Sequence, residues 1–147
     1  MIKRKDLFKK EYIGLLCPYS FEFLNHLIGQ LGYSQEQYDN LKVKQNVLTV
    51  IKLLFDLGIL TVHDWVNNKD LNNENLTSLD IINKIDDLWI KGIKYPDFYN
   101  IVLFGTSGWY VKKLENLGMT PTTNWETFVK EKIGNLEKWI EDNRPKG

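Results

Sequence analysis

Cysteine, arginine and histidine are scarce in this 147-residue chain. Cys17 is the single cysteine, which excludes an internal disulfide and a zinc site built on several cysteines of one chain. Arginine occurs only at Arg4 and Arg144. Because basic side chains supply most of the affinity for phosphate and arginine is the main reader of guanine, this composition disfavours specific nucleic-acid binding. The two histidines, His26 and His63, leave a metal site short of ligands.

Long apolar runs are missing as well. The basic start over residues 1–6 is not followed by the apolar segment that a secretory signal or a membrane span requires. We therefore expect a cytoplasmic protein that does not associate with a membrane. The rest of the composition is that of an ordinary globular chain, with 43% apolar and 26% charged residues and no net charge. Its length suits one domain, residues 1–147, with a hydrophobic core.

Apolar residues recur at helical spacing through most of the chain. They predict helices over residues 21–32, 34–58, 77–92, 107–116 and 124–140. The expected N-terminal caps are Ser20, the capping-box pairs Ser34–Gln37 and Thr77–Asp80, and Thr123 or Asn124. The pattern over residues 34–58 fits either one continuous helix or a helix that is interrupted near residues 39–40. The apolar side of the predicted helix over 77–92 is expected to hold Leu79, Ile82, Ile85 (or Ile81) and Trp89.

Two short stretches rich in β-branched and alternating residues predict strands at 59–65 and 99–105. Residues 67–75 are polar and rich in asparagine, and are expected to form a flexible loop. Residues 1–10 are expected to be a frayed first helix or an arm, and residues 143–147 a tail. The predicted fold class is therefore α+β, a helix-dominated single domain with a small antiparallel sheet. Its order of elements is close to that of a winged helix with an inserted helix.

Residues 105–108, Gly-Thr-Ser-Gly, lie between an apolar run and an amphipathic pattern, as phosphate loops and nucleophile elbows do. An elbow needs glycine two positions after its serine, and Trp109 stands there instead. The spacing and the lysine of a Walker loop are absent. We therefore interpret this stretch as a structural turn in which Thr106 or Ser107 caps the following helix.

The remaining candidate catalytic groups do not form a recognisable set. Cys17 and His26 lie too far apart to share one helical face, so the sequence places no base beside the thiol. His63 and Asp64 are neighbours on a predicted strand, where adjacent side chains point to opposite faces. We expect no catalytic residues, no metal and no cofactor.

Acidic residues are concentrated in the middle of the chain. Residues 56–97, called the acidic segment below, hold eight acidic residues and four lysines, a net charge of −4. Residues 1–55 carry +3 and residues 98–147 carry +1. A negative segment repels phosphate and attracts a basic protein.

Three stretches carry a family resemblance: VIKLLFDLGILTVHDW, then SLDIINKIDDLWIKG, then IVLFGTSGWYVKKL. They combine a helix that ends in a leucine-rich turn and glycine, a short strand, a helix that ends in tryptophan, and a strand that ends in aromatic-x-Thr-x-Gly. This pattern resembles small bacterial immunity proteins encoded beside polymorphic or contact-dependent growth inhibition toxins. The likeness covers about residues 47–114. It implies that Thr106 and Gly108 begin the last helix of the pattern, and it carries over no catalytic residues.

The resemblance and the charge layout together predict a non-enzymatic immunity protein that covers a cognate, basic toxin domain. The residues expected to bind this partner are Asp64, Asp70, Glu74, Asp80, Asp86 and Asp87, with Trp65 as an aromatic anchor or a core residue. The alternative is a winged-helix nucleic-acid binder or transcriptional regulator that would use Lys42, Lys44 and Lys52. A third possibility is a small hydrolase that uses Cys17 or Ser107.

Overall fold

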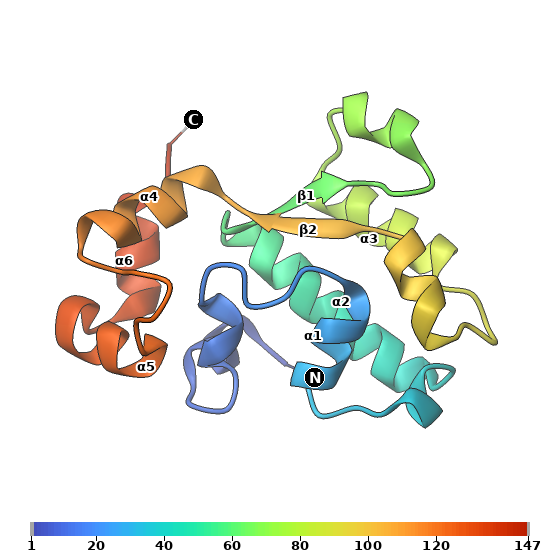
Figure 1. Cartoon of the computed structure of the whole chain (residues 1–147), viewed down its shortest axis with the longest axis horizontal. Coiled ribbons are helices and arrows are strands. Elements are labelled where there is room, and N and C mark those ends of the chain that lie inside the picture. The colour runs from blue at the N-terminus through green and yellow to red at the C-terminus, as the bar shows by residue number, and fades with distance from the viewer. Residues whose placement is uncertain (1, 147) are drawn as a thin grey trace.

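A computed structural model describes residues 2–146, and helices dominate the fold (Figure 1). The helices are α1 (Leu24–Gln30), α2 (Leu41–Asp56), α3 (Ser78–Leu88), α4 (Gly108–Asn116), α5 (Trp125–Phe128) and α6 (Leu136–Asn143). Shorter 3-10 turns are η1 (Arg4–Phe8), η2 (Ile13–Leu16), η3 (Gln35–Gln37), η4 (Lys69–Asn73) and η5 (Tyr95–Asn100), and η6 (Val129–Ile133) is a π turn. With the strands β1 (Leu60–Asp64) and β2 (Leu103–Thr106), this confirms the α+β class.

The two strands form a small antiparallel sheet. Leu60 pairs with Thr106 and Val62 with Phe104, and the register shifts between Val62 and Asp64. The strands are joined through η4, α3 and η5 rather than by a tight hairpin. In Figure 1 the sheet lies above the long helix α2, and α4 to α6 gather at the left. The helix α2 packs against both α3 and β1, so it forms the centre of the molecule.

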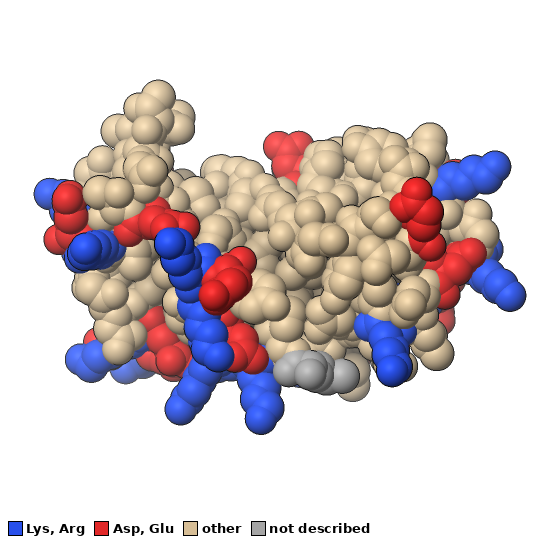
Figure 2. Space-filling model, turned by 90° about the horizontal axis from the view of Figure 1, so that it is seen from below, with Lys and Arg blue, Asp and Glu red and all other residues tan. Residues whose placement is uncertain are grey.

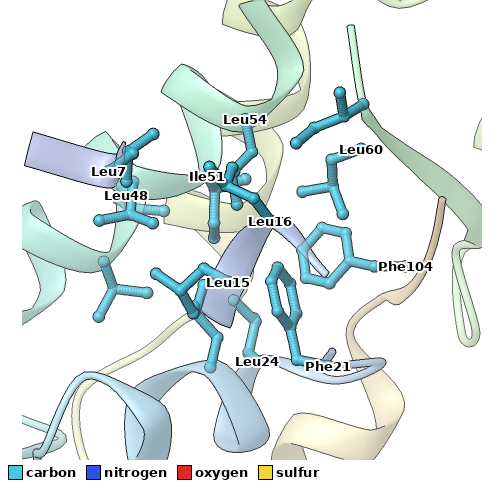
Figure 3. Packing of buried hydrophobic residues seen from close by; sticks show 14 of the residues in the cluster. Leu7, Leu15, Leu16, Phe21, Leu24, Leu48, Ile51, Leu54, Leu60 and Phe104 are labelled. Carbon is cyan, nitrogen blue, oxygen red and sulfur yellow. The ribbon is translucent and has the colours of Figure 1, made fainter. Parts of the chain in front are cut away.

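One hydrophobic cluster draws side chains from all six α-helices and from both strands. Its centre is the inner face of α2, where buried residues recur three or four positions apart. Figure 3 shows Ile51 and Leu54 of α2 beside Leu16 of the N-terminal segment and Phe104 of β2. Since apolar burial is the main favourable term in folding, this cluster holds the sheet, α2 and the N-terminal segment together.

The N-terminal segment is packed, which corrects the expectation of a frayed helix or arm over residues 1–10. Leu7 is fully buried in the core, and Arg4 forms ion pairs with Glu137 and Glu141 of α6. The expected tail over 143–147 is also held at its start, because Asn143 belongs to α6 and Arg144 donates a hydrogen bond to the Asp56 carbonyl (2.9 Å). Met1 and Gly147, the ends of these two expected segments, lie outside the described residues.

Several predicted helix starts are confirmed. Asn40 accepts a hydrogen bond from the Val43 amide at the start of α2 (3.1 Å), so the helix is interrupted near residues 39–40. The capping boxes Ser34–Gln37 and Thr77–Asp80 are both present, and Asn124 caps α5. The predicted cap at Ser20 is wrong, since α1 begins only at Leu24 and the Ser20 hydroxyl donates to the Leu15 carbonyl.

Two predictions from spacing are wrong. The second strand begins at Leu103 rather than at residue 99, because Pro96 and the Asp97 side chain set up the turn η5 before it. On α3, Leu79 is 55% exposed and Ile81 takes the inner position. The predicted loop over 67–75 contains the 3-10 turn η4.

The predicted helix over 124–140 is also divided. Gly134 has φ of 85°, a left-handed conformation that helices do not continue through, and Asn135 begins α6 by accepting from the Lys138 amide. The chain can therefore fold α6 back toward η1, which it contacts. Within residues 2–146, no helix combines the length and the apolar character that crossing a bilayer requires.

Candidate functional site

The stretch over 105–108 is a strand-to-helix turn. Ser107 occupies the N-cap position of α4, and its amide donates to the Ile59 carbonyl (2.8 Å), but its side chain makes no capping bond. The Thr106 hydroxyl accepts from the Tyr19 amide (2.9 Å). A Cβ added at Gly105 would stand 3.1 Å from the Thr61 hydroxyl, so close packing across the sheet explains the glycine. These contacts give residues 105–108 a structural role, as the turn that connects β2 to α4.

The candidate nucleophile Cys17 is half-buried in a mainly apolar hollow of about 330 Å³ that Val111 and Met119 also line. Burial raises the pKa of its thiol, which lowers the thiolate fraction at neutral pH. His26 lies elsewhere, with its ring edge-on to Phe23 (centroids 5.7 Å apart). The structure therefore does not bring these two candidate groups together.

Asp64 is held by the η4 loop and not by its neighbour His63. Its two carboxylate oxygens accept from Lys69 (2.9 Å) and from the Asn72 amide group (2.7 Å). Those two hydrogen bonds, with the Lys69 charge, hold the pKa of Asp64 below its ordinary value. Asn72 also accepts from the Trp65 backbone amide (2.8 Å), so this one side chain fastens the loop to the end of β1. Asn72 was not singled out from the sequence, where it is one asparagine among several.

Trp65 lies in the core. It is 1% exposed and belongs to the central hydrophobic cluster. A side chain that anchors a partner must be reachable from solvent, so Trp65 is corrected from a candidate anchor to a core residue.

The six predicted acidic residues divide by position between the β1–η4 region and α3. Asp64 ends β1, Asp70 and Glu74 lie in and next to η4, and Asp80, Asp86 and Asp87 lie on α3. Asp80 and Asp87 are seven residues apart, two turns of one helix face.

Half of these carboxylates have partners within the chain. Asp80 accepts from the Thr77 amide, which lowers its pKa and uses it as a cap. Asp86 forms an ion pair with Lys44 of α2 (2.8 Å). Asp64 is paired as described above.

The other half are exposed without such partners. Among residues 2–146, the side-chain carboxylates of Asp70, Glu74 and Asp87 make no hydrogen bond or ion pair, and we call them the three unpaired carboxylates. Glu74 also lines a groove of about 320 Å³ beside β1, with Thr61, His63 and Asn72. Seen from below, on the side away from η4, acidic and basic side chains are interspersed and the middle is largely uncharged (Figure 2).

The lysines of the nucleic-acid alternative are mostly engaged. Lys44 bonds to the C-terminal end of α3, and Lys52 pairs with Asp56 on its own helix (2.7 Å). Lys42 is exposed. A phosphate would therefore have to compete with acidic partners at two of the three positions.

Among residues 2–146, histidine, cysteine and carboxylate side chains do not gather in any group of three or more that could hold a metal ion. Comparison with known proteins gives no match to a family model, to a curated protein or to a solved structure.

Proposed function

We propose that this chain is a non-enzymatic immunity protein that binds a basic toxin domain and blocks it by covering its active surface. The observation that carries the proposal is the set of three unpaired carboxylates, Asp70, Glu74 and Asp87, on the acidic segment. Their charge is not cancelled by a cation of the same chain, so it is available to a partner.

The family resemblance supports the proposal independently. It spans about residues 47–114, which form most of α2, the whole sheet, α3 and the first turns of α4. The three unpaired carboxylates lie inside this span. Neutralisation by coverage needs no reacting group; of the two candidate nucleophiles, Cys17 packs against the hydrophobic core and Ser107 is buried at the start of α4.

Co-expression with the product of the neighbouring gene tests the proposal. We expect the neighbouring product, or its C-terminal domain, to arrest growth when expressed alone and to be harmless when this chain is present. The two purified proteins should form a stable complex on size exclusion. Growth arrest that persists with this chain present, together with separate elution of the two proteins, would refute the immunity function.

A charge variant and a matched control localise the contact. The variant replaces Asp70→Asn, Glu74→Gln and Asp87→Asn, and the control replaces the exposed Glu115→Gln, Glu126→Gln and Glu131→Gln on α4, α5 and η6. Both remove three negative charges. The first should weaken the complex and the second should not, because only the first removes charge from the proposed contact. Equal effects would show that net charge alone matters.

A further inference from the structure

The strand β1 has β2 along one edge and, among residues 2–146, no strand along the other. Two hydrogen bonds show which backbone groups face this open edge. The Ser107 amide donates to the Ile59 carbonyl (2.8 Å), so these two residues form a hydrogen-bonded pair. The Phe104 amide donates to the Glu22 carbonyl (2.7 Å), away from β1. Hydrogen-bonded pairs of an antiparallel sheet alternate with pairs whose amides and carbonyls point outward, so these two bonds fix the alternation.

Leu60 and Val62 are the residues of β1 whose backbone faces the open edge. Val62 stands opposite Phe104, and Leu60 lies two positions earlier, so both belong to the outward-pointing pairs. Within the described part of the chain, no backbone group bonds to either residue from that side. Thr61, between them, stands opposite Gly105 in a pair that is bonded across the sheet. The open edge therefore offers two amides and two carbonyls, which are the groups that an added strand requires.

A groove of about 320 Å³ runs along this edge. All residues from 60 to 63 line it, and the rest of its lining comes from the chain through η4 and from Ile81 of α3. In Figure 1 the segment through η4 leaves the end of β1 and turns back toward α3. From the rise and the spacing of strands, one residue of an added strand occupies roughly 150 Å³. The groove thus accepts a short stretch of extended chain, which matches the two outward-facing residues of β1.

The side chains of the groove define what that stretch would carry. Phe55, Leu71 and Leu76 are partly buried and pack against the core, so they give the groove an apolar wall. Among its described lining residues there is one carboxylate, Glu74, and no lysine or arginine. Glu74 is exposed and is one of the three unpaired carboxylates. Because side chains alternate between the two faces of a strand, a segment that alternates aliphatic with basic residues suits both features.

We propose that the open edge of β1 is the docking strand for the toxin. An extended segment of the basic toxin domain pairs with Leu60 and Val62 as a third strand, and one of its lysines or arginines pairs with Glu74. The identity of this partner rests on the proposed immunity function. A second copy of this chain fits less well, because its own β1 carries no lysine or arginine and would bring a second Glu74 to the contact.

Amide hydrogen exchange followed by NMR tests the strand pairing. In the free chain, the Val62 amide should exchange at least about tenfold faster than the Thr61 amide, because only the Thr61 amide is bonded to β2. In the complex with the product of the neighbouring gene, exchange at Leu60 and Val62 should slow by about tenfold or more. A complex that forms without this slowing would overturn the strand pairing and leave the immunity function standing.

A peptide probe separates the groove from the toxin. The peptide Lys-Val-Lys-Val-Lys-Val should bind the full chain at one site with a dissociation constant below about 1 mM and slow exchange at Val62. The control peptide Glu-Val-Glu-Val-Glu-Val should bind about tenfold more weakly or less, because it meets Glu74 with like charge. Equal binding of the two peptides, or none by the first, would overturn the proposal. Protection of Val62 that grows with the concentration of the chain alone would overturn it too, by assigning the edge to a second copy. Binding of the lysine peptide without any complex with the neighbouring product would support the groove and refute the immunity function.

Two variants of Val62 isolate the backbone contact. Val62→Pro removes the amide that faces the open edge, at a position where proline breaks no bond to β2. Val62→Ala also shortens the side chain but keeps the amide, so it is the matched control. The proline variant should bind the lysine peptide about tenfold more weakly than the alanine variant. Equal affinities would overturn the strand pairing.

Glu74→Lys keeps the test open if proline disturbs the strand. It leaves the backbone of β1 unchanged and should reverse the preference between the two peptides, so that the glutamate peptide binds more tightly. An unchanged preference would show that Glu74 does not select the occupant, and the proposal would fall.

Discussion

Ser107 stands at the N-cap of α4 without making the bond that gives a cap its stabilising effect. A capping hydroxyl is worth about 0.5–2 kcal/mol, but here the contact with Ile59 comes from the backbone amide, which alanine retains. We therefore expect Ser107→Ala to change the free energy of unfolding by less than about 0.5 kcal/mol and to leave binding intact. Urea denaturation measures the first effect.

Asn40 provides the matched control for that measurement. Its side chain does accept the Val43 amide, so Asn40→Ala should cost about 1 kcal/mol. If Ser107→Ala proves as destabilising as Asn40→Ala, the hydroxyl has a role that the geometry of α4 does not reveal. A stable Ser107→Ala protein that has lost function would point to a site at this turn.

The raised pKa of the Cys17 thiol predicts how its alkylation depends on pH. Burial raises the pKa of its thiol, so less thiolate is present at any given pH than for an exposed cysteine. Alkylation by iodoacetamide in the folded protein should be slower than in the urea-unfolded chain at the same pH. Its rate should rise only as the pH passes the raised pKa. Equal rates in the folded and unfolded chains would contradict the burial.

At the scale of elements, Lys44 joins α2 to the end of α3. Its ammonium group donates to the Trp89 carbonyl (2.8 Å) and the Asp86 carbonyl (3.0 Å) and pairs with the Asp86 carboxylate. Cations at a helix C-terminus are favourable, and this one is largely buried. Lys44→Met should therefore destabilise the protein by about 1–3 kcal/mol, because the helix carbonyls lose their partner.

Lys42→Met is the comparison, since Lys42 is on the same helix and exposed. It should change the free energy of unfolding by less than about 0.5 kcal/mol. Chemical denaturation of both variants separates the effect of this contact from the effect of losing a positive charge. Similar losses in the two variants would mean that the bonds from Lys44 contribute nothing specific.

Elements whose ends are encoded locally were predictable from the sequence. The capping boxes at Ser34 and Thr77 depend on residues three positions apart, so a local pattern identifies them. The glycines that end helices can be recognised from the local sequence in the same way. Gly58 has φ of 79° and ends α2 where the pattern placed the end.

Features that depend on distant contacts were not predictable. Leu7 is buried by segments far along the chain, and its polar surroundings in the sequence resemble a frayed terminus. Ile81 and Leu79 are two positions apart, and only the packing of α3 against α2 decides which one faces inward. Likewise, the sequence located the carboxylates of the candidate site, but the pairing of Asp86 with Lys44 and the burial of Trp65 arise from the tertiary fold.

At the scale of the whole molecule, net charge conceals an uneven arrangement. The chain is neutral overall, yet its acidic segment carries −4. Several of those acidic side chains cap helices or form ion pairs within the chain. The electrostatic field that a distant partner meets therefore depends mainly on the exposed carboxylates without partners. Asp70 and Glu74 lie in and beside η4, and Asp87 lies on α3.

Steered association is the property of the whole molecule that this arrangement predicts. If the proposed basic toxin is attracted by these charges, the variant Asp70→Asn, Glu74→Gln, Asp87→Asn should associate with it roughly three- to tenfold more slowly at low salt. Dissociation should change less, because exposed charges influence encounter more than the final contact. Raising the salt concentration should slow the unmodified protein more than the variant, since fewer exposed charges remain to be screened. Stopped-flow association measured at low and high salt provides the test, with the Glu115, Glu126 and Glu131 variant as the control of equal charge. An association rate and salt dependence that match those of the unmodified protein would show that these carboxylates only solvate the surface, and the toxin contact would then have to be sought away from η4 and α3.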